Sequence, residues 1–354
     1  MTTISEPRVR QHGRALVALA VVALLALFNA GCATKSADVS ARSAAATDPN
    51  RSSTLIWATI TAYPQEEIDK KAEYVRFLPY VAEHMRQYGI TDVKLVIGDS
   101  PTTVATWLRE GKVDFFDESP FSAYIVSRLS GADEPLLNRW KYGTEKFTGV
   151  IFTRKKGGVK SLDELKGKMI VLKDPTSTAN YFLPKWYLIS KGYTVSEKKS
   201  LEDQVAPGEI GYVFNMHSRD REVEMVMDGV VAGGGISDEF IEKLLARGSQ
   251  SNAEARHPRA GAPQTRPEDL RILARTDTTL RRLLTVRKDL DPRVKAAVKD
   301  LLLNMHQSPE GQAVLKTYGP STRFSNADTP EVAYVGIRDK GKLLEDEVAR
   351  WAKR

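Results

Sequence analysis

Short runs of apolar residues alternate along the chain with segments in which apolar residues recur at helical spacing. The first helical segment follows a strand at 55–60, has apolar positions from Ala72 to Met85 and ends near Gly89. This alternation predicts an α/β fold in which helices flank a parallel sheet. Strands are predicted over 55–60, 93–97, 113–116, 149–154, 168–172, 212–214 and 283–286, and later helices over 294–305 and 311–315, before a charged C-terminal helix.

One of these strands leads into a turn that is rich in hydroxyl groups. The strand at 168–172 is followed by the stretch 174–187, in which Thr176, Ser177 and Thr178 stand where a helix should begin. Hydroxyl groups at this position cap free N–H groups, and the helix dipole makes the same place attractive to an anion. The turn therefore indicates a small oxyanion site, although an ordinary N-cap with extra turn residues has the same local sequence.

Pro184 stands inside this expected helix. A proline removes the helical hydrogen bond to the carbonyl four residues earlier, which here belongs to Asn180. Either the first turn is kinked, or the regular helix begins nearer to Pro184.

The N-terminus has the pattern of an export signal. Three arginines precede fourteen unbroken apolar residues at 15–28, and Cys32, the only cysteine in the chain, directly follows Ala30 and Gly31. Such a pattern is typical of a secretory signal, and fourteen residues are too few to span a bilayer comfortably. The sequence around Cys32 resembles the lipobox of bacterial lipoproteins, in which the cysteine becomes the lipidated first residue, although Asn29 stands where Leu is preferred. The alternatives are a plain secreted protein with an incidental thiol and an uncleaved anchor.

Two segments after the predicted signal peptide (1–31) are polar and lack periodicity. Residues 32–53 are predicted to form a flexible tether between membrane and domain. Residues 246–267 are rich in Arg, Ala, Gly, Ser and Gln and are predicted to be a surface insertion or a disordered loop. The total of 354 residues allows two domains of ordinary size.

The charge of the chain is modestly positive. The formal net charge is +7, and removal of residues 1–31, which hold three Arg and one Glu, lowers it to +5. A positive surplus suits an anion-binding protein, but it equally suits a surface near anionic lipid. No combination of aromatic and basic residues indicates binding of nucleic acid.

Several segments, taken in their order, resemble the phosphate/phosphonate-type periplasmic substrate-binding proteins of ABC transporters, the PhnD-like family. The resemblance runs from about residue 54 to residue 325. Its strongest parts are Leu-Arg-Glu-Gly-Lys-Val-Asp at 108–114 with the helix at Pro120, Thr-Gly-Val-Ile-Phe-Thr-Arg at 148–154, Ser-Leu-Asp-Glu-Leu-Lys-Gly-Lys at 161–168, and 174–184.

This resemblance implies the type II periplasmic-binding-protein (venus flytrap) fold, in which two α/β lobes hold the ligand in the cleft between them. The first lobe is expected over 54–147, and the chain is expected to return to it over 276–354, including the C-terminal helix. The second lobe is expected over 148–275.

The resemblance also implies a ligand site to which both lobes contribute. At the helix start, the hydroxyls of Ser177 and Thr178 and the N–H of Ala179 are expected to bind phosphonate-like oxygens. His217 falls where the family often has a histidine near the anion. Further ligand contacts are expected from Ser237 or Asp238 at the other end of the ligand, and from Tyr63, Ser119 and Tyr124 on the opposite lobe.

The sequence departs from the family pattern beside this expected site. Ala179 and Asn180 stand where the family continues with Ser-Gly, so one hydroxyl is missing and a bulkier residue follows. Asp117 and Glu118 precede Ser119, and carboxylates at this place would repel a fully ionised phosphate. They could instead accept hydrogen bonds from a protonated oxyanion or a ligand amine, or they could cap the following helix.

Several of the expected ligand contacts have a structural alternative. His217 could be a solvated loop residue, and Tyr63 and Tyr124 could be wall or core aromatics. Arg281 and Arg282 could reach an anion across the cleft, or they could form a solvated pair.

The resemblance implies the substrate-binding component of an ABC transporter, which delivers a phosphorus oxyanion (phosphate, phosphite or phosphonate) to a membrane permease. Such a protein is not an enzyme, needs no cofactor or metal, and is expected to be a monomer outside the cytoplasm, anchored through Cys32. A lipoprotein of the same fold that presents its ligand to a membrane receptor or kinase is the alternative. An exported phosphoester hydrolase is disfavoured, because the sequence has no histidine–carboxylate cluster with metal spacing and no Gly-x-Ser-x-Gly elbow.

Overall fold

The structure, a computed structural model, describes residues 53–61, 63–249 and 269–354. The described residues from Ser53 to Arg354 belong to one compact unit. The predicted signal peptide, the lipidation site Cys32 and the tether up to Ser52 lie outside the described residues, and so does most of the predicted insertion. Within the described part, no helix combines the length and the apolar character that crossing a membrane requires.

The first of two six-stranded sheets is mixed, with the strand order β12-β4-β11-β3-β1-β2. Strand β1 (Thr54–Ile60) pairs in parallel with β2 (Asp92–Gly98) and β3 (Phe115–Glu118). The parallel sheet predicted from the sequence is therefore correct for these three strands. The remaining strands pair antiparallel, and they are β4 (Asp133–Lys141), β11 (Leu283–Arg287) and β12 (Ser321–Asn326).

The second sheet has the order β10-β5-β9-β6-β8-β7. Its β9, β6, β8 and β7 are parallel, whereas β5 pairs antiparallel with both β9 and β10. The carboxyl ends of β6, β8 and β9 therefore meet at one edge, where α/β proteins bind ligands. The strands are β5 (Lys146–Arg154), β6 (Lys168–Leu172), β7 (Thr194–Glu197), β8 (Glu209–Phe214), β9 (Gly233–Ser237) and β10 (Leu270–Leu280).

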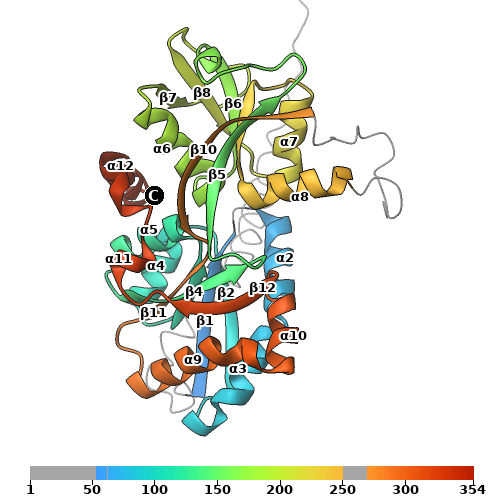
Figure 1. Ribbon diagram of the computed structural model, residues 1–354. Helices are drawn as coiled ribbons and strands as arrows, with labels where there is room; N and C mark the ends of the chain where they lie inside the picture. Colours follow the sequence, from blue (N-terminus) through green and yellow to red (C-terminus); the bar gives the residue numbers. More distant parts are fainter. Residues whose placement is uncertain (1–52, 62, 250–268) are drawn as a thin grey trace, which may run out of the picture. The chain divides into compact units, whose positions relative to one another are not determined.

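The chain passes between the two sheets twice. It leaves the first sheet after Lys141 and enters the second at Lys146, and it returns between Leu280 and Leu283. Figure 1 shows β5 and β10 side by side where they run from one lobe toward the other. The predicted two-lobed α/β fold is confirmed. The lobe boundaries were predicted at 147–148 and 275–276, whereas the chain passes between the sheets at 141–146 and 280–283.

The helix predicted from Ala72 to Met85 is in fact two helices, α2 (Pro64–Tyr74) and α3 (Phe77–Met85). Pro79 explains the break, because its ring clashes with a helical carbonyl four residues earlier, at Val75. The other α-helices are α4 (Pro101–Arg109), α5 (Pro120–Ser130), α6 (Leu183–Ser190), α7 (Arg219–Met227), α8 (Asp238–Ser249), α9 (Pro292–Asn304), α10 (Pro309–Thr317), α11 (Pro330–Ala333) and α12 (Gly341–Ala352). Helix α8 includes the first four residues of the predicted insertion.

Apolar packing continues from one lobe into the other. The ring of Phe121 on α5 stacks on the ring of Phe182 in the second lobe, with the centroids 4.2 Å apart. Both rings are buried in a cluster that draws residues from both sheets. The last helix also bridges the lobes, because Glu347 of α12 pairs with Lys185 of α6 at 2.7 Å, while Thr102 of α4 donates to the carbonyl of Trp351 at 2.8 Å.

Candidate anion-binding site

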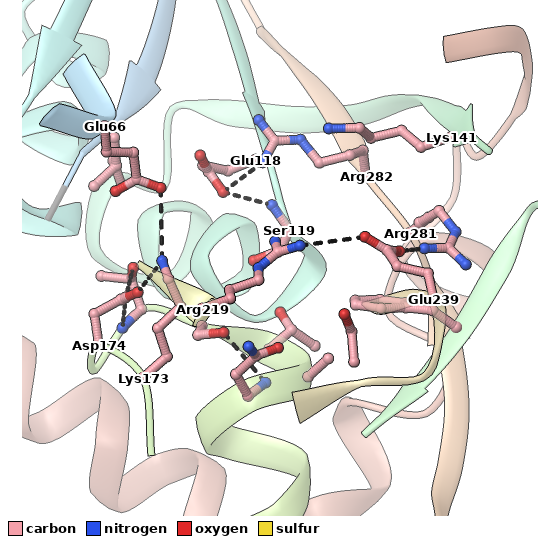
Figure 2. A pocket seen from close by; sticks show the side chains of 18 of the residues that line it. Glu66, Glu118, Ser119, Lys141, Lys173, Asp174, Arg219, Glu239, Arg281 and Arg282 are labelled. Carbon is pink, nitrogen blue, oxygen red and sulfur yellow. Dashed lines mark hydrogen bonds and ion pairs between the residues drawn. The ribbon is translucent and has the colours of Figure 1, made fainter. Parts of the chain in front are cut away.

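A cavity of about 100 Å³ lies between the two sheets. Its walls come from the ends of β1, β3, β6 and β9 and from the first two turns of α2, α7 and α8, together with the segments where the chain crosses between the lobes. Figure 2 shows charged side chains from both lobes pointing into this space. The predicted residues Ser119, Ser177, Thr178 and Ala179 all line it.

Two side chains of the hydroxyl-rich turn after β6 accept hydrogen bonds from backbone N–H groups of the same turn. Asp174 accepts a bond from the Thr176 N–H at 2.8 Å, and Ser177 accepts one from the Asn180 N–H at 3.2 Å. Ser177 is therefore an N-cap, as local sequence suggested. The N–H groups of the first helical turn have no acceptors within the helix itself, and here they lie at the cavity.

Pro184 sets where the regular helix begins. Thr178–Phe182 form a single π-helical turn, and α6 starts at Leu183 with Pro184 in its first turn. Of the two predicted arrangements, the regular helix beginning near Pro184 is correct. The first turn of α6 tolerates this proline, because an N–H at the start of an α-helix has no partner within the helix.

A second helix N-terminus reaches the cavity from the first lobe. Ser119 is the N-cap residue of α5, and its side chain makes no capping bond. The next residues bond across the cleft: the Phe121 N–H donates to Oγ1 of Thr178 at 3.1 Å, and Oγ of Ser122 donates to the Thr176 carbonyl at 2.8 Å. Two helix N-termini, one from each lobe, thus meet at the cavity, and both favour negative charge there.

Six basic side chains and four acidic ones line the cavity. Each of the acidic groups has a basic partner. Lys173 pairs with Glu66 across the cleft at 3.6 Å and with Asp174 at 2.8 Å; Glu118 pairs with Lys70 and Arg282, and Glu239 pairs with Arg219 and Arg281. The remaining cation is Lys141.

Arg281 and Arg282 do not form a solvated pair. Their side chains are 5% and 12% exposed, and both line the cavity. The sequence could not show this, because the burial depends on acidic partners from distant segments. Arg282 is held by Asp117 at 3.2 Å and by Glu118 at 2.9 Å.

Asp117 and Glu118 were predicted either to contact the ligand or to cap the helix after them. At the start of that helix, Glu118 accepts one bond of 2.9 Å, from the N–H of the N-cap residue Ser119. Both acidic residues belong to β3 and are buried. Burial alone would raise the pKa of each carboxyl, but Arg282 acts on both, with Arg139 beside Asp117 and Lys70 beside Glu118, and the pKa of each is held below its usual range. These carboxylates therefore stay ionised and form ion pairs with the basic side chains around them.

Lys141 stands out among the cations. Its Nζ is 3.9 Å from Oε1 of Glu73, which is a long ion pair. Burial, together with the neighbouring charges of Arg139, Arg282 and Arg219, lowers the pKa of Lys141 to about 7, against the opposing effect of Glu73. A negative charge placed in the cavity would restore its proton.

A buried carboxyl lies behind the helix start. Glu222 on α7 is fully buried, and its Oε2 accepts a bond from the Asn180 side chain at 3.3 Å, while Oε1 has no hydrogen-bond partner within the described part of the chain. Burial raises the pKa of Glu222 to about 8, although Lys173 acts in the opposite direction. Glu222 is therefore mostly protonated at pH 7 and supports Asn180, which lines the cavity.

Four other predicted site residues do not line the cavity. Tyr63 lies beside Lys173, whose Nζ is 5.4 Å from the centre of its ring, and Tyr124 packs edge-on against Tyr334. His217 is exposed on the loop before α7. Asp238 accepts a bond from the Thr148 N–H at 3.1 Å, whereas the adjacent Ser237 lines the cavity.

Most of the basic residues of the cavity could not be predicted from the sequence. Lys173 and Arg219 had local signals, since Lys173 directly follows β6 and precedes the hydroxyl turn, and Arg219 follows the Ser218 cap of α7. Lys70 and Lys141 had none, because a lysine in a helix or at a strand end is usually solvated. No cluster of three or more His, Cys, Asp or Glu suited to a metal ion occurs in the described ranges.

The sequence matches one protein family over residues 60–332, described as "ABC transporter, phosphonate, periplasmic substrate-binding protein". The match includes both helix starts, the β10–β11 crossing and all six basic residues of the cavity.

Solved structures share the fold at low sequence identity. XAC2383 from Xanthomonas citri bound to ATP is 24% identical, with a TM-score of 0.68 over 85% of this chain and 98% of that one. PhnD1 from Prochlorococcus marinus in complex with methylphosphonate is 16% identical, with a TM-score of 0.58 over 83% and 99%. A binding protein component of an ABC phosphonate transporter from Pseudomonas aeruginosa is 15% identical, with a TM-score of 0.55 over 85% and 98%.

Proposed function

Because the chain belongs to the family of periplasmic substrate-binding proteins of phosphonate ABC transporters, we propose that it binds a small phosphorus oxyanion between its lobes and delivers it to a membrane permease. The ligand would be an anion of phosphate, phosphite or phosphonate type. The family is one of binding proteins rather than enzymes, so affinity and lobe closure carry its function.

The observation that supports this proposal most directly is the meeting of two helix N-termini at one cavity. Ser119 begins the helix from the first lobe, and Ser177, Thr178 and Ala179 begin the helix from the second. The hydroxyls of Ser119, Ser177 and Thr178 and the N–H of Ala179 would donate to the oxyanion, and the surrounding cations would balance its charge. We also propose Ser237 as a contact in preference to Asp238, because its buried hydroxyl lines the cavity and has no hydrogen-bond partner in the part of the chain described.

The size of the cavity favours a small anion. Sites for drug-sized ligands occupy roughly 300–1,000 Å³, whereas this cavity is about 100 Å³. The Xanthomonas citri structure holds ATP, which is far larger than a phosphonate. We therefore expect phosphate or a small phosphonate, not a nucleotide, to fit between the lobes in this arrangement.

A thermal-shift screen of the chain from residue 33 onward tests the ligand class. The panel is phosphate, phosphite, methylphosphonate, sulfate, ATP and glutamate. A ligand that binds only the folded state raises the melting temperature, by an amount set by its concentration relative to Kd. We expect a rise with at least one phosphorus oxyanion and none with sulfate or glutamate. A rise with ATP alone would replace the small-anion proposal, and no rise with any compound would refute it.

Delivery to a permease is tested in cells. We expect deletion of the gene to abolish uptake of the labelled anion found in the screen, and a copy with Cys32→Ser to lose incorporation of a labelled lipid. If deletion left uptake intact but abolished a response to the anion, the protein would present its ligand to a receptor instead.

A further inference from the structure

Apart from Glu66, which pairs with Lys173 of the second lobe, the cavity wall from the first lobe carries an excess of positive charge. Within this wall and the layer behind it, Lys70, Arg139, Lys141 and Arg282 face three acids, Glu73, Asp117 and Glu118. Around Lys173 the acidic groups are in excess, since this one lysine pairs with both Glu66 and Asp174. Figure 2 shows Lys141 and Arg282 on one side of the cavity and Lys173 and Asp174 on another. The cavity is therefore asymmetric in charge.

Lys141 lines the cavity. Gly319 lies close to it, since an added Cβ there would be 2.8 Å from Nζ of Lys141 and 2.5 Å from Oε2 of Glu73. Within the described part of the chain, the acidic partner of the ammonium group is Glu73, at 3.9 Å. The cations around it come from β4, from α7 and from the crossing at 281–282, and they are Arg139, Arg219 and Arg282.

In the described part of the chain, Lys141 thus has one acidic partner at long range and three cations around it. The oxygens of a phosphonate are expected at the helix starts, where the N–H and O–H donors are. We propose that Lys141 and Arg282 bind a second anionic group of the ligand, so that the preferred ligand is an organophosphonate whose substituent carries a carboxylate or a similar anion. This inference rests on the proposed function and adds the chemistry of the substituent to it.

A ligand with an amine on its substituent fits this wall poorly. Asp117 and Glu118 are the carboxylates that could have accepted it, but Arg139 and Arg282 hold the first, and Lys70 and Arg282 hold the second. An ammonium group would thus meet the basic side chains of the wall. Like charges placed together in a desolvated site oppose binding strongly.

Three phosphonates of similar size separate the possibilities: phosphonoacetate, ethylphosphonate and 2-aminoethylphosphonate. Calorimetric titration into the chain from residue 33 should give the tightest binding for phosphonoacetate. A hydrogen bond to a charged group is worth roughly 1.5–3 kcal/mol, so we expect its Kd to be about 10–100-fold below that of ethylphosphonate. The aminoethyl compound should bind most weakly of the three.

Substitution of Lys141 tests whether the preference for phosphonoacetate depends on the charge of this side chain. Lys141→Met should bring phosphonoacetate and ethylphosphonate close to equal affinity, and Lys141→Arg should retain most of the preference because the charge is kept. Lys342→Met is the matched control, since it removes a lysine whose side chain is 87% exposed on α12. Circular dichroism and melting temperature confirm that each variant is folded.

Two results would overturn the inference while leaving the proposed function intact: equal affinity for phosphonoacetate and ethylphosphonate, or tightest binding of the aminoethyl compound. A preference for phosphonoacetate that survives in Lys141→Met would also overturn it. If none of the three phosphonates, nor phosphate or phosphite, bound at all, the proposed function itself would fail.

Discussion

Thr178 in the second lobe accepts a hydrogen bond of 3.1 Å from the backbone N–H of Phe121 in the first lobe. A hydroxyl group can accept one bond and still donate another, so Thr178 keeps its proton for a ligand oxygen. The same side chain therefore links the lobes and faces the cavity. Ligand affinity and lobe closure should both depend on it.

Thr178→Val tests this double role, because valine has nearly the same shape but no hydroxyl. The change leaves the Phe121 N–H buried without its acceptor, at a cost of about 1–3 kcal/mol in the closed arrangement, and it removes one donor to the anion. We expect Kd for the ligand found in the screen to rise by at least ~10-fold in calorimetric titration.

Thr317→Val is the matched control for this substitution. The hydroxyl of Thr317 donates to the carbonyl of Val314 inside α10 at 2.8 Å, away from the cavity. The Thr317→Val variant should have a lower melting temperature but an unchanged affinity for the anion. If Thr178→Val bound the anion as tightly as Thr317→Val, the helix start would not be the anion site.

Lys141 should make anion binding depend on pH. The pKa of its amine is lowered to about 7 in the free cavity, and a bound anion raises it again. Above pH 7, binding then requires a proton to be taken up, so affinity should fall as the pH rises from 7 to 9. In Lys141→Arg the guanidinium is charged at all these pH values and takes up no proton.

The measurement is the ratio of Kd values for the wild type and Lys141→Arg at several pH values, because the ionisation of the ligand cancels in that ratio. Titrations in buffers of different ionisation enthalpy give the number of protons taken up directly. A ratio that stays constant from pH 7 to 9 would show that Lys141 does not titrate with binding.

Local chemistry explains which parts of the site could be predicted from the sequence. Ser177 caps its helix and Pro184 marks where α6 becomes regular, and both effects act within a few residues. Such signals survive in any tertiary context, because a cap and a missing N–H are properties of the segment itself. The hydroxyl turn was therefore found without knowledge of the fold.

The basic wall could not be predicted, because its residues become a site only through long-range pairing. Arg139 lies in β4, a strand that escaped prediction because Pro135 and the charged residues around it are typical of loops. In the structure Pro135 lies beside a shift in the β4–β11 register, where the sheet tolerates a proline. The partners that make the burial of Arg139 possible are distant in sequence: Asp117 pairs with it at 3.1 Å, and the Tyr318 carbonyl accepts a bond from it at 2.9 Å.

Glu222 should make the stability of the protein fall as the pH rises. Burial raises the pKa of its carboxyl to about 8, whereas an unfolded glutamic acid has a pKa of about 4.3. Between these values the unfolded state has lost a proton that the folded state keeps. The free energy of unfolding therefore falls with rising pH, by up to ~1.4 kcal/mol per pH unit, and the contribution is complete only below about pH 4.

Glu222→Gln should remove this slope, since glutamine keeps the shape and does not titrate. Urea denaturation of both proteins at pH 5.5, 6.5 and 7.5 measures the difference. We expect the variant to gain on the wild type at each step upward in pH. Parallel pH profiles for the two proteins would mean that Glu222 is ionised in the folded state.

The bridge between α12 and the second lobe should respond to single and double substitutions in opposite ways. The side chain of Glu347 is 3% exposed and pairs with Lys185 at 2.7 Å, and the hydroxyl of Tyr181 also donates to it. Lys185→Met leaves a buried carboxylate without its main partner, so the free energy of unfolding should fall by about 3 kcal/mol. Adding Glu347→Leu removes the unpaired charge and fills the space with apolar atoms, so the double variant should recover most of this loss.

Urea denaturation of the wild type, the two single variants and the double variant completes a double-mutant cycle. Additive losses would mean that the pair does not couple the helix to the lobe, whereas recovery in the double variant would show that α12 is attached to the second lobe through this buried pair.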